Sequence, residues 1–150
     1  MAGKTAERAL IDKGRTFLGL APEAARNALG GAPQEVMGDA YGSMRYLTSL
    51  EAENIFPGTL YLEGDQVRLV RLHHHGLEGI TRSELSSWIG GEPTMLRSRA
   101  GKRAQLLVYA SKGIAFSCQG EHLDFLELFN PCTQAEYETR YYRPPAQFVR

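Results

Sequence analysis

A self-similar segment constrains the fold of this chain more than any other feature of its sequence. Residues 20–33, LAPEAARNALGGAP, align without gaps on residues 80–93, ITRSELSSWIGGEP, at an offset of 60 residues. Both segments place apolar residues at helical spacing and end in Gly-Gly-x-Pro. Because glycine ends a helix and a following proline prevents it from resuming, each segment predicts a short helix that ends at Gly30 or Gly90.

Strand-like sequence follows each of these predicted helices. Residues 58–72 and 113–129 each contain two runs of strand-forming residues around a polar turn with a central glycine, which is the signal of a β-hairpin. A shorter strand-like run precedes each hairpin, at 44–47 and at 107–110, and the link at 49–57 has no counterpart in the second half. The sequence therefore predicts an α+β protein made of two tandem helix–antiparallel-strand repeats.

Two further helices are expected outside these repeats. One covers about residues 5–17, and the other covers residues 133–142 and opens with a Thr-x-x-Glu capping box. A chain of 150 residues fits one domain. We interpret residues 1–150 as a single compact domain, with repeat 1 at about 18–75, repeat 2 at about 76–130, and a C-terminal helix and tail at 131–150.

This arrangement resembles the tandem repeat of the β-lactamase inhibitor protein family, whose single-repeat relative is the small outer-membrane assembly lipoprotein. The residues that carry the resemblance are Leu29–Pro33 and Ile89–Pro93, with the strands that follow them. The resemblance implies a curved antiparallel sheet with helices on its convex face and an open concave face that binds a protein partner. The chain departs from the exported members because its start carries neither an export signal nor a lipid-attachment cysteine.

The charge and cysteine content narrow the classes of function. Lys plus Arg and Asp plus Glu both number 17, so the chain has no global field that would gather nucleic acid or acidic membranes. Two cysteines, Cys118 and Cys132, are too few for a disulfide framework, and the sequence does not decide whether they form a disulfide bond with each other. No stretch approaches the roughly 18 apolar residues of a membrane-spanning helix. We therefore expect a soluble, cytoplasmic protein with no membrane partner.

Three consecutive histidines, His73 to His75, are the most conspicuous candidate ligands. Neutral imidazole binds zinc, nickel or copper, and a fourth histidine stands at His122. On a strand, however, adjacent side chains alternate between faces, so at most His73 and His75 converge. We therefore interpret the run as a solvated turn and expect neither a metal site nor another cofactor.

A basic loop forms a second candidate site. It carries Arg97, Arg99, Lys102 and Arg103, with Gly101 allowing a turn. Phosphate binding and base stacking would also draw on the C-terminal residues Arg140, Tyr141, Tyr142 and Arg143. The zero net charge and the acidic residues nearby in the sequence make nucleic acid an unlikely partner.

Four aromatic residues, Tyr46, Tyr61, Tyr109 and Phe116, recur at corresponding positions of the two predicted repeats. They either belong to the core or line the open face of the sheet, where aromatic rings anchor partner proteins. Strand alternation favours exposure of Tyr61, because its neighbours Leu60 and Leu62 would face the helices.

These patterns lead to one main hypothesis for the function and two alternatives. The main hypothesis is a non-enzymatic protein-interaction module of unknown partner that uses the open sheet face, with Tyr46, Tyr61, Tyr109, Phe116, Arg97 and Arg99 as its binding residues. The first alternative is a small-molecule or metal-binding protein, or an enzyme, with a pocket between the two halves that uses His73 and His75. The second is nucleic-acid binding through the basic loop. No catalytic motif is present, which favours the non-enzymatic hypothesis.

Overall fold

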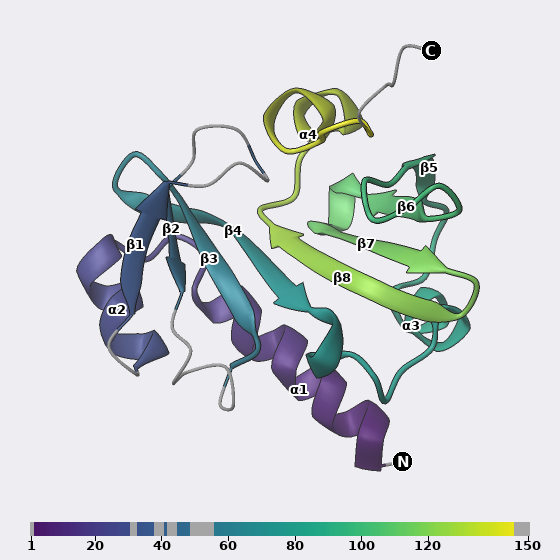
Figure 1. Cartoon of the computed structure of the whole chain (residues 1–150), viewed down its shortest axis with the longest axis horizontal. Coiled ribbons are helices and arrows are strands. Elements are labelled where there is room, and N and C mark those ends of the chain that lie inside the picture. The colour runs from purple at the N-terminus through teal and green to yellow at the C-terminus, as the bar shows by residue number, and fades with distance from the viewer. Residues whose placement is uncertain (1, 31–32, 38–40, 42–44, 49–55, 146–150) are drawn as a thin grey trace.

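The computed structural model of the protein describes residues 2–30, 33–37, 41, 45–48 and 56–145. This part of the chain forms four α-helices and one open antiparallel sheet of eight strands, in the spatial order β1-β2-β3-β4-β8-β7-β6-β5 (Figure 1). The predicted α+β class is therefore confirmed. In the sheet the first four strands of the chain lie on one side and the last four on the other, joined by the β4–β8 pair.

The predicted helices and strands occur in the expected order, and two short strands that the sequence did not predict, β1 and β5, follow α2 and α3. The helices are α1 (Ala2–Thr16), α2 (Pro22–Leu29), α3 (Arg82–Ile89) and α4 (Gln134–Arg140). The strands are β1 (Gln34–Met37), β2 (Arg45–Thr48), β3 (Gly58–Glu63), β4 (Gln66–His73), β5 (Thr94–Arg97), β6 (Gln105–Tyr109), β7 (Ile114–Gln119) and β8 (His122–Phe129). Short 3-10 turns cover His74–Gly76 and Ala110–Lys112.

Local signals in the sequence account for the helix ends. Thr81 and Thr133 each accept a hydrogen bond from the backbone N–H of the glutamate three residues later, and that glutamate bonds back to the threonine N–H. Both capping boxes are thus complete, as expected. Gly30 and Gly90 follow α2 and α3 with φ of 72° and 76°, a region that favours glycine, so the predicted helix ends are confirmed.

The sheet separates two apolar clusters. On one face, α1, α2 and α3 pack through residues such as Ile11, Ala25 and Leu85 against the inward-facing leucines of the strands. On the other face, Tyr137 and Tyr141 at α4 pack with residues of several strands. The helices therefore lie on both faces of the sheet, not on one face as the resemblance implies. The reason is that the aromatic side chains of α4 find apolar strand residues on the second face.

Three other expectations concern parts of the chain outside the candidate site. The link between β2 and β3 was expected to have no counterpart in the second half, but its residues 49–55 lie outside the described residues. Cys118 and Cys132 are both free, so the bond between them that the sequence left open is not formed. Among the described residues, no helix is long and apolar enough to cross a membrane.

Candidate functional site

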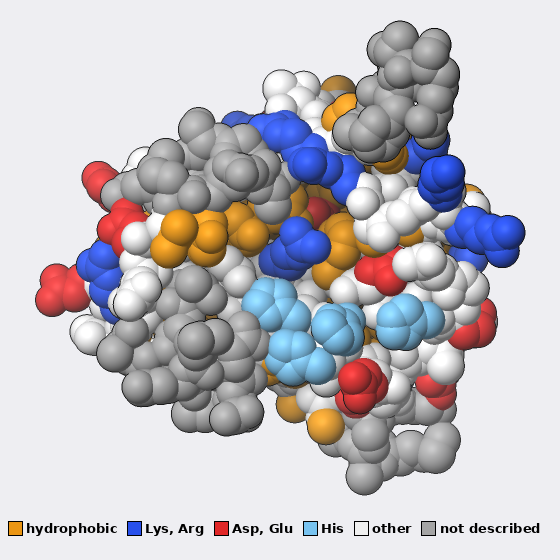
Figure 2. Space-filling model, in the orientation of Figure 1, with side chains coloured by type: hydrophobic (Ala, Val, Ile, Leu, Met, Phe, Trp, Pro, Cys, Tyr) orange, Lys and Arg blue, Asp and Glu red, His pale blue; other side chains and the backbone are white. Residues whose placement is uncertain are grey.

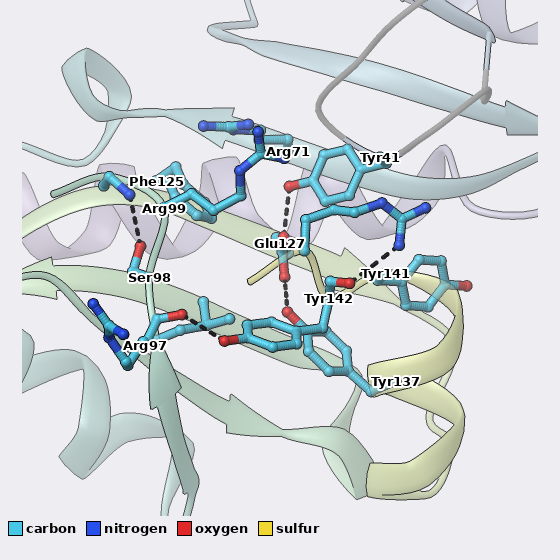
Figure 3. Close-up of a pocket in the computed structure, with 13 residues that line it drawn as sticks. Tyr41, Arg71, Arg97, Ser98, Arg99, Phe125, Glu127, Tyr137, Tyr141 and Tyr142 are labelled. Atoms are coloured by element: carbon cyan, nitrogen blue, oxygen red, sulfur yellow. Dashed lines mark hydrogen bonds between the residues drawn. The ribbon is translucent and has the colours of Figure 1, made fainter. Parts of the chain in front are cut away.

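A cavity of about 250 Å³ opens on the sheet face that α4 partly covers (Figure 3). It lies where the two halves of the sheet meet, because β4 of the first half and β8 of the second both contribute to its lining. Its lining combines four arginines (Arg71, Arg97, Arg99 and Arg143), four tyrosines (Tyr41, Tyr137, Tyr141 and Tyr142), Phe125 and one carboxylate, Glu127. We refer to this cavity as the arginine–tyrosine pocket.

Glu127 is buried at the base of this pocket, with 3% of its surface exposed. The hydroxyl of Tyr41 donates to Oε2 at 2.5 Å and the hydroxyl of Tyr137 donates to Oε1, so the carboxyl group lies between the two rings (Figure 3). Burial raises the pKa of Glu127, although the two hydroxyls and Arg71 oppose the shift. Burial followed by the charge of Glu127 raises the pKa of both tyrosines, so they stay protonated donors.

Arg71 stands directly opposite Glu127 in the β4–β8 ladder. Its guanidinium carbon lies 4.1 Å from the centroid of the Phe125 ring and 5.9 Å from that of Tyr41. Burial alone would lower the pKa of Arg71, but Tyr41, Tyr61 and Glu127 together raise it above the ordinary value. Arg71 is therefore a fixed cation that also bonds to the side chain of Tyr61, and stacking on an aromatic ring leaves the edge of a guanidinium group accessible to further acceptors.

The basic loop reaches the pocket through Arg97 and Arg99, which are exposed. Buried Ser98 holds the loop, because its hydroxyl pairs with that of Ser117 at 2.5 Å and accepts the N–H of Ala100 at 3.1 Å. The hydroxyl of Tyr142 donates to the Arg97 carbonyl at 2.9 Å and ties the C-terminal segment to β5. The loop and the C-terminal residues that the sequence suggested for phosphate binding therefore meet at one pocket. Lys102, Arg103 and Arg140 do not line it.

Tyr46 and Tyr61 lie on the same sheet face as the pocket. Tyr61 faces away from α1, α2 and α3, as alternation predicted. It is only 5% exposed, however, so the expectation that it is exposed is wrong. The rings of Tyr41 and Tyr46 cover it, with centroids 4.6 Å and 5.4 Å from its own.

Tyr109 and Phe116 lie on the opposite face, in the core beneath the helices. They do not share a face with Tyr61, because Phe116 is four residues before the turn glycine Gly120, whereas Tyr61 is three residues before Gly64. A difference of one residue along a strand reverses the face to which a side chain points. Tyr109 and Phe116 are buried there and offer no surface to a partner.

A second cavity, of about 220 Å³, is lined by His73, His74, His75, Asp124, Arg71 and Phe125. We refer to it as the histidine hollow. His73 Nε2 lies 2.9 Å from Thr59 Oγ1. Among the described residues, no three His, Cys, Asp or Glu side chains are grouped so that they could hold a metal ion.

The two thiols have environments that disfavour reactivity. Burial raises the pKa of Cys118 and also that of Cys132, and a reactive cysteine needs the opposite shift. Neither thiol lines the arginine–tyrosine pocket.

Sequence reasoning missed five charged or aromatic residues of the site, namely Tyr41, Arg71, Phe125, Glu127 and Tyr137. One signal could have found two of them. Arg71 interrupts the apolar run LVRL in β4, and Glu127 interrupts the run FLELF in β8. A charge inside an apolar strand needs a partner where it is buried, which is a reason to suspect a site.

Comparisons with protein-family models, with curated proteins and with solved structures give no match to this chain. The inference of function therefore rests on the chemistry of the site itself.

Proposed function

We propose that this protein is a non-enzymatic binding module that takes up an anionic molecule, with a phosphate or carboxylate group, in the arginine–tyrosine pocket. The observation that carries the proposal is the imbalance of charge in the lining. Four arginines line the cavity, and its one carboxylate already accepts hydrogen bonds from two tyrosines. The planar guanidinium group donates two parallel hydrogen bonds to a carboxylate or phosphate, so an anion satisfies these arginines well.

The geometry of Glu127 supports binding over acid–base catalysis. A general base needs a carboxylate that can reach the proton of a bound substrate. Both oxygens of Glu127 instead accept tyrosine hydroxyls, and the side chain is buried. The role that we assign to Glu127 is to hold Tyr41 and Tyr137 in place.

The size of the cavity indicates the scale of the ligand. Ligand pockets commonly measure about 300–1,000 Å³, so a cavity of about 250 Å³ suits a small molecule or one acidic group of a larger one. Phe125 and Tyr142 add aromatic surface, against which the apolar part of a ligand can pack.

The tandem repeat is part of this proposal, and the spacing of the described elements supports it. α2 and α3 begin 60 residues apart, as do β1 and β5, and β2 and β6. β4 and β8 begin 56 residues apart, and Arg71 and Glu127 are separated by the same 56 residues. In this interpretation the two charged residues are equivalent positions of two repeats, and the pocket lies at their junction, in keeping with the resemblance to the β-lactamase inhibitor protein family.

A second candidate function is protein binding, the main hypothesis from sequence, here with an acidic segment as the partner. One observation favours it: Met95 on the edge strand β5 is 48% exposed, in the same strand as Arg97. An exposed apolar side chain on an edge strand, where a peptide can add a further strand, is a suitable contact for a peptide. An acidic peptide whose affinity falls in Met95→Ala would favour this candidate.

Calorimetric titration with inorganic phosphate and with citrate at low ionic strength tests the proposal. We expect the double variant Arg97→Ala/Arg99→Ala to weaken the better of these ligands at least about tenfold, since charge-assisted hydrogen bonds are lost. Lys102→Ala/Arg103→Ala removes the same charge from the same loop without touching the pocket, and should stay within about twofold of wild type. Equal weakening in both variants would show that the attraction is non-specific and would contradict the proposal.

A further inference from the structure

The arginine–tyrosine pocket and the histidine hollow share two residues, Arg71 and Phe125. Arg71 lines both cavities while its guanidinium group lies over the Phe125 ring. One face of that guanidinium group is thus covered by the ring, and the hydrogen-bond donors lie along its edge. A fixed cation therefore stands at the boundary of the two cavities, where it can meet a ligand that occupies either of them.

The histidine hollow presents hydrogen-bond donors at its imidazoles. A neutral imidazole offers one N–H donor beside one acceptor, and a protonated one offers two donors. The carboxylate of the hollow, Asp124, already accepts the Ser117 hydroxyl at 3.0 Å and the Gln119 amide at 3.1 Å, and His122 lies 3.9 Å from it. Both oxygens of Asp124 therefore already accept hydrogen bonds from the protein.

The surface view shows the two regions as neighbours. Figure 2 shows histidine side chains gathered across the middle of one face, next to Lys and Arg side chains on the same face. His74 and His75 belong to the turn that directly follows β4, the strand that carries Arg71. Arg71 thus stands between the imidazoles of the histidine hollow and the other arginines of the arginine–tyrosine pocket, because it lines both cavities.

We propose that the ligand is a small molecule with a chain of two or more linked phosphate groups, which extends from the arginine–tyrosine pocket past Arg71 into the histidine hollow. This inference rests on the proposed function, because it takes the arginine–tyrosine pocket as the place where one phosphate binds. A single anion can fill one cavity only, whereas linked phosphates bring a second anionic group to Arg71 and a third to His74 and His75. Once one phosphate is bound, the others bind at a high effective concentration.

Calorimetric titrations at pH 6.5 and constant ionic strength test this inference, with inorganic phosphate, tripolyphosphate and adenosine triphosphate as the probes. We expect tripolyphosphate to bind wild type at least about tenfold more tightly than phosphate does. The double variant His74→Ala/His75→Ala should weaken tripolyphosphate about five- to tenfold and leave phosphate within about twofold. Lys102→Ala/Arg103→Ala is the control, because neither of these cations lines either cavity, and it should leave both affinities within about twofold of wild type.

The outcomes separate this inference from the function on which it rests. If tripolyphosphate binds no more tightly than phosphate, or if His74→Ala/His75→Ala has no effect, the inference is overturned. The proposed function still stands in that case, provided that Arg97→Ala/Arg99→Ala weakens phosphate. Failure of every anion to bind overturns both. Equal affinities for tripolyphosphate and the nucleotide would assign recognition to the phosphate chain alone, and tighter binding of the nucleotide would add its base to the recognised groups; both results support the inference.

Discussion

Arg71 and Glu127 stand directly opposite each other in the β4–β8 ladder, yet different groups hold the two charges. Glu127 accepts hydrogen bonds from Tyr41 and Tyr137, while Arg71 lies over the ring of Phe125. The carboxylate therefore organises tyrosines at the base of the pocket, and the guanidinium group stays oriented toward the cavities that it lines. In the function that we propose, this division makes the pair a support for anion binding rather than a simple ion pair.

The tyrosine hydroxyls give the first prediction. Glu127→Ala would leave the buried hydroxyls of Tyr41 and Tyr137 without their acceptor, so we expect a loss of about 2–4 kcal/mol in the free energy of unfolding. Glu127→Gln keeps the shape and one carbonyl acceptor, and should cost less. Urea denaturation of the two variants beside wild type measures the difference. Equal stability of Glu127→Ala and wild type would contradict the role assigned to this residue.

The raised pKa of Glu127 predicts a dependence of stability on pH. An acid whose pKa is raised in the folded state binds its proton more tightly there than in the unfolded state. Its contribution to stability is therefore full below the unfolded value of about 4.3 and is lost as the pH rises through the folded value. We expect the stability of wild type relative to Glu127→Gln to fall as the pH rises above about 4.3. Urea midpoints across the acid range check this, and a difference that is flat or rises with pH would contradict it.

The sequence alone suggests that Tyr61 is exposed, so that its truncation would cost little stability. The burial of Tyr61 reverses this expectation. Because Tyr61 is covered by Tyr41 and Tyr46, Tyr61→Ala should cost about 3–5 kcal/mol of stability, as large-to-small core changes do. Met95→Ala removes an exposed side chain and should stay within about 0.5 kcal/mol of wild type. Thermal unfolding of both variants makes the comparison. A small effect in Tyr61→Ala would return this residue to the list of surface anchors.

The two capping boxes provide a matched pair of variants that separates stability from binding. Thr81→Ala and Thr133→Ala each remove one N-cap and should each cost about 1 kcal/mol. α4 carries Tyr137 and precedes the other C-terminal pocket residues, whereas α3 packs on the opposite face of the sheet. We therefore expect Thr133→Ala alone to weaken phosphate binding as well. Equal affinities in the two variants would indicate that α4 does not shape the pocket.

Local signals in the sequence predicted much of the fold. The capping residues Thr81 and Thr133, and the glycines at the ends of α2 and α3, act within one helical turn, so their effects can be inferred without tertiary contacts. The sequence also named the basic loop and Tyr142 together as candidates for phosphate binding, and they meet in the pocket, although the contact that joins them links residues 45 apart in the sequence.

The rest depended on long-range packing and on strand register. Tyr41 and Glu127 are 86 residues apart, and no local pattern indicates that they form a hydrogen bond. The sequence did not decide to which face of the sheet Phe116 points. Strand alternation fixes only the orientation of side chains relative to their neighbours, and a shift of one residue inverts the face. The β7–β8 ladder also shifts its register between Ser117 and Cys118, and alternation alone does not predict such a shift.

Two-dimensional 1H–15N NMR spectra recorded during a titration with inorganic phosphate test the central claim most directly. Binding in the arginine–tyrosine pocket predicts saturable shifts that are concentrated in the backbone amides of Arg97 to Ala100 and of Tyr142 and Arg143. Lys102, Arg103 and Lys112, cations outside the pocket, should change little. Shifts that spread evenly over all these cations, or spectra that stay unchanged at millimolar phosphate, would contradict the claim that this pocket is an anion-binding site.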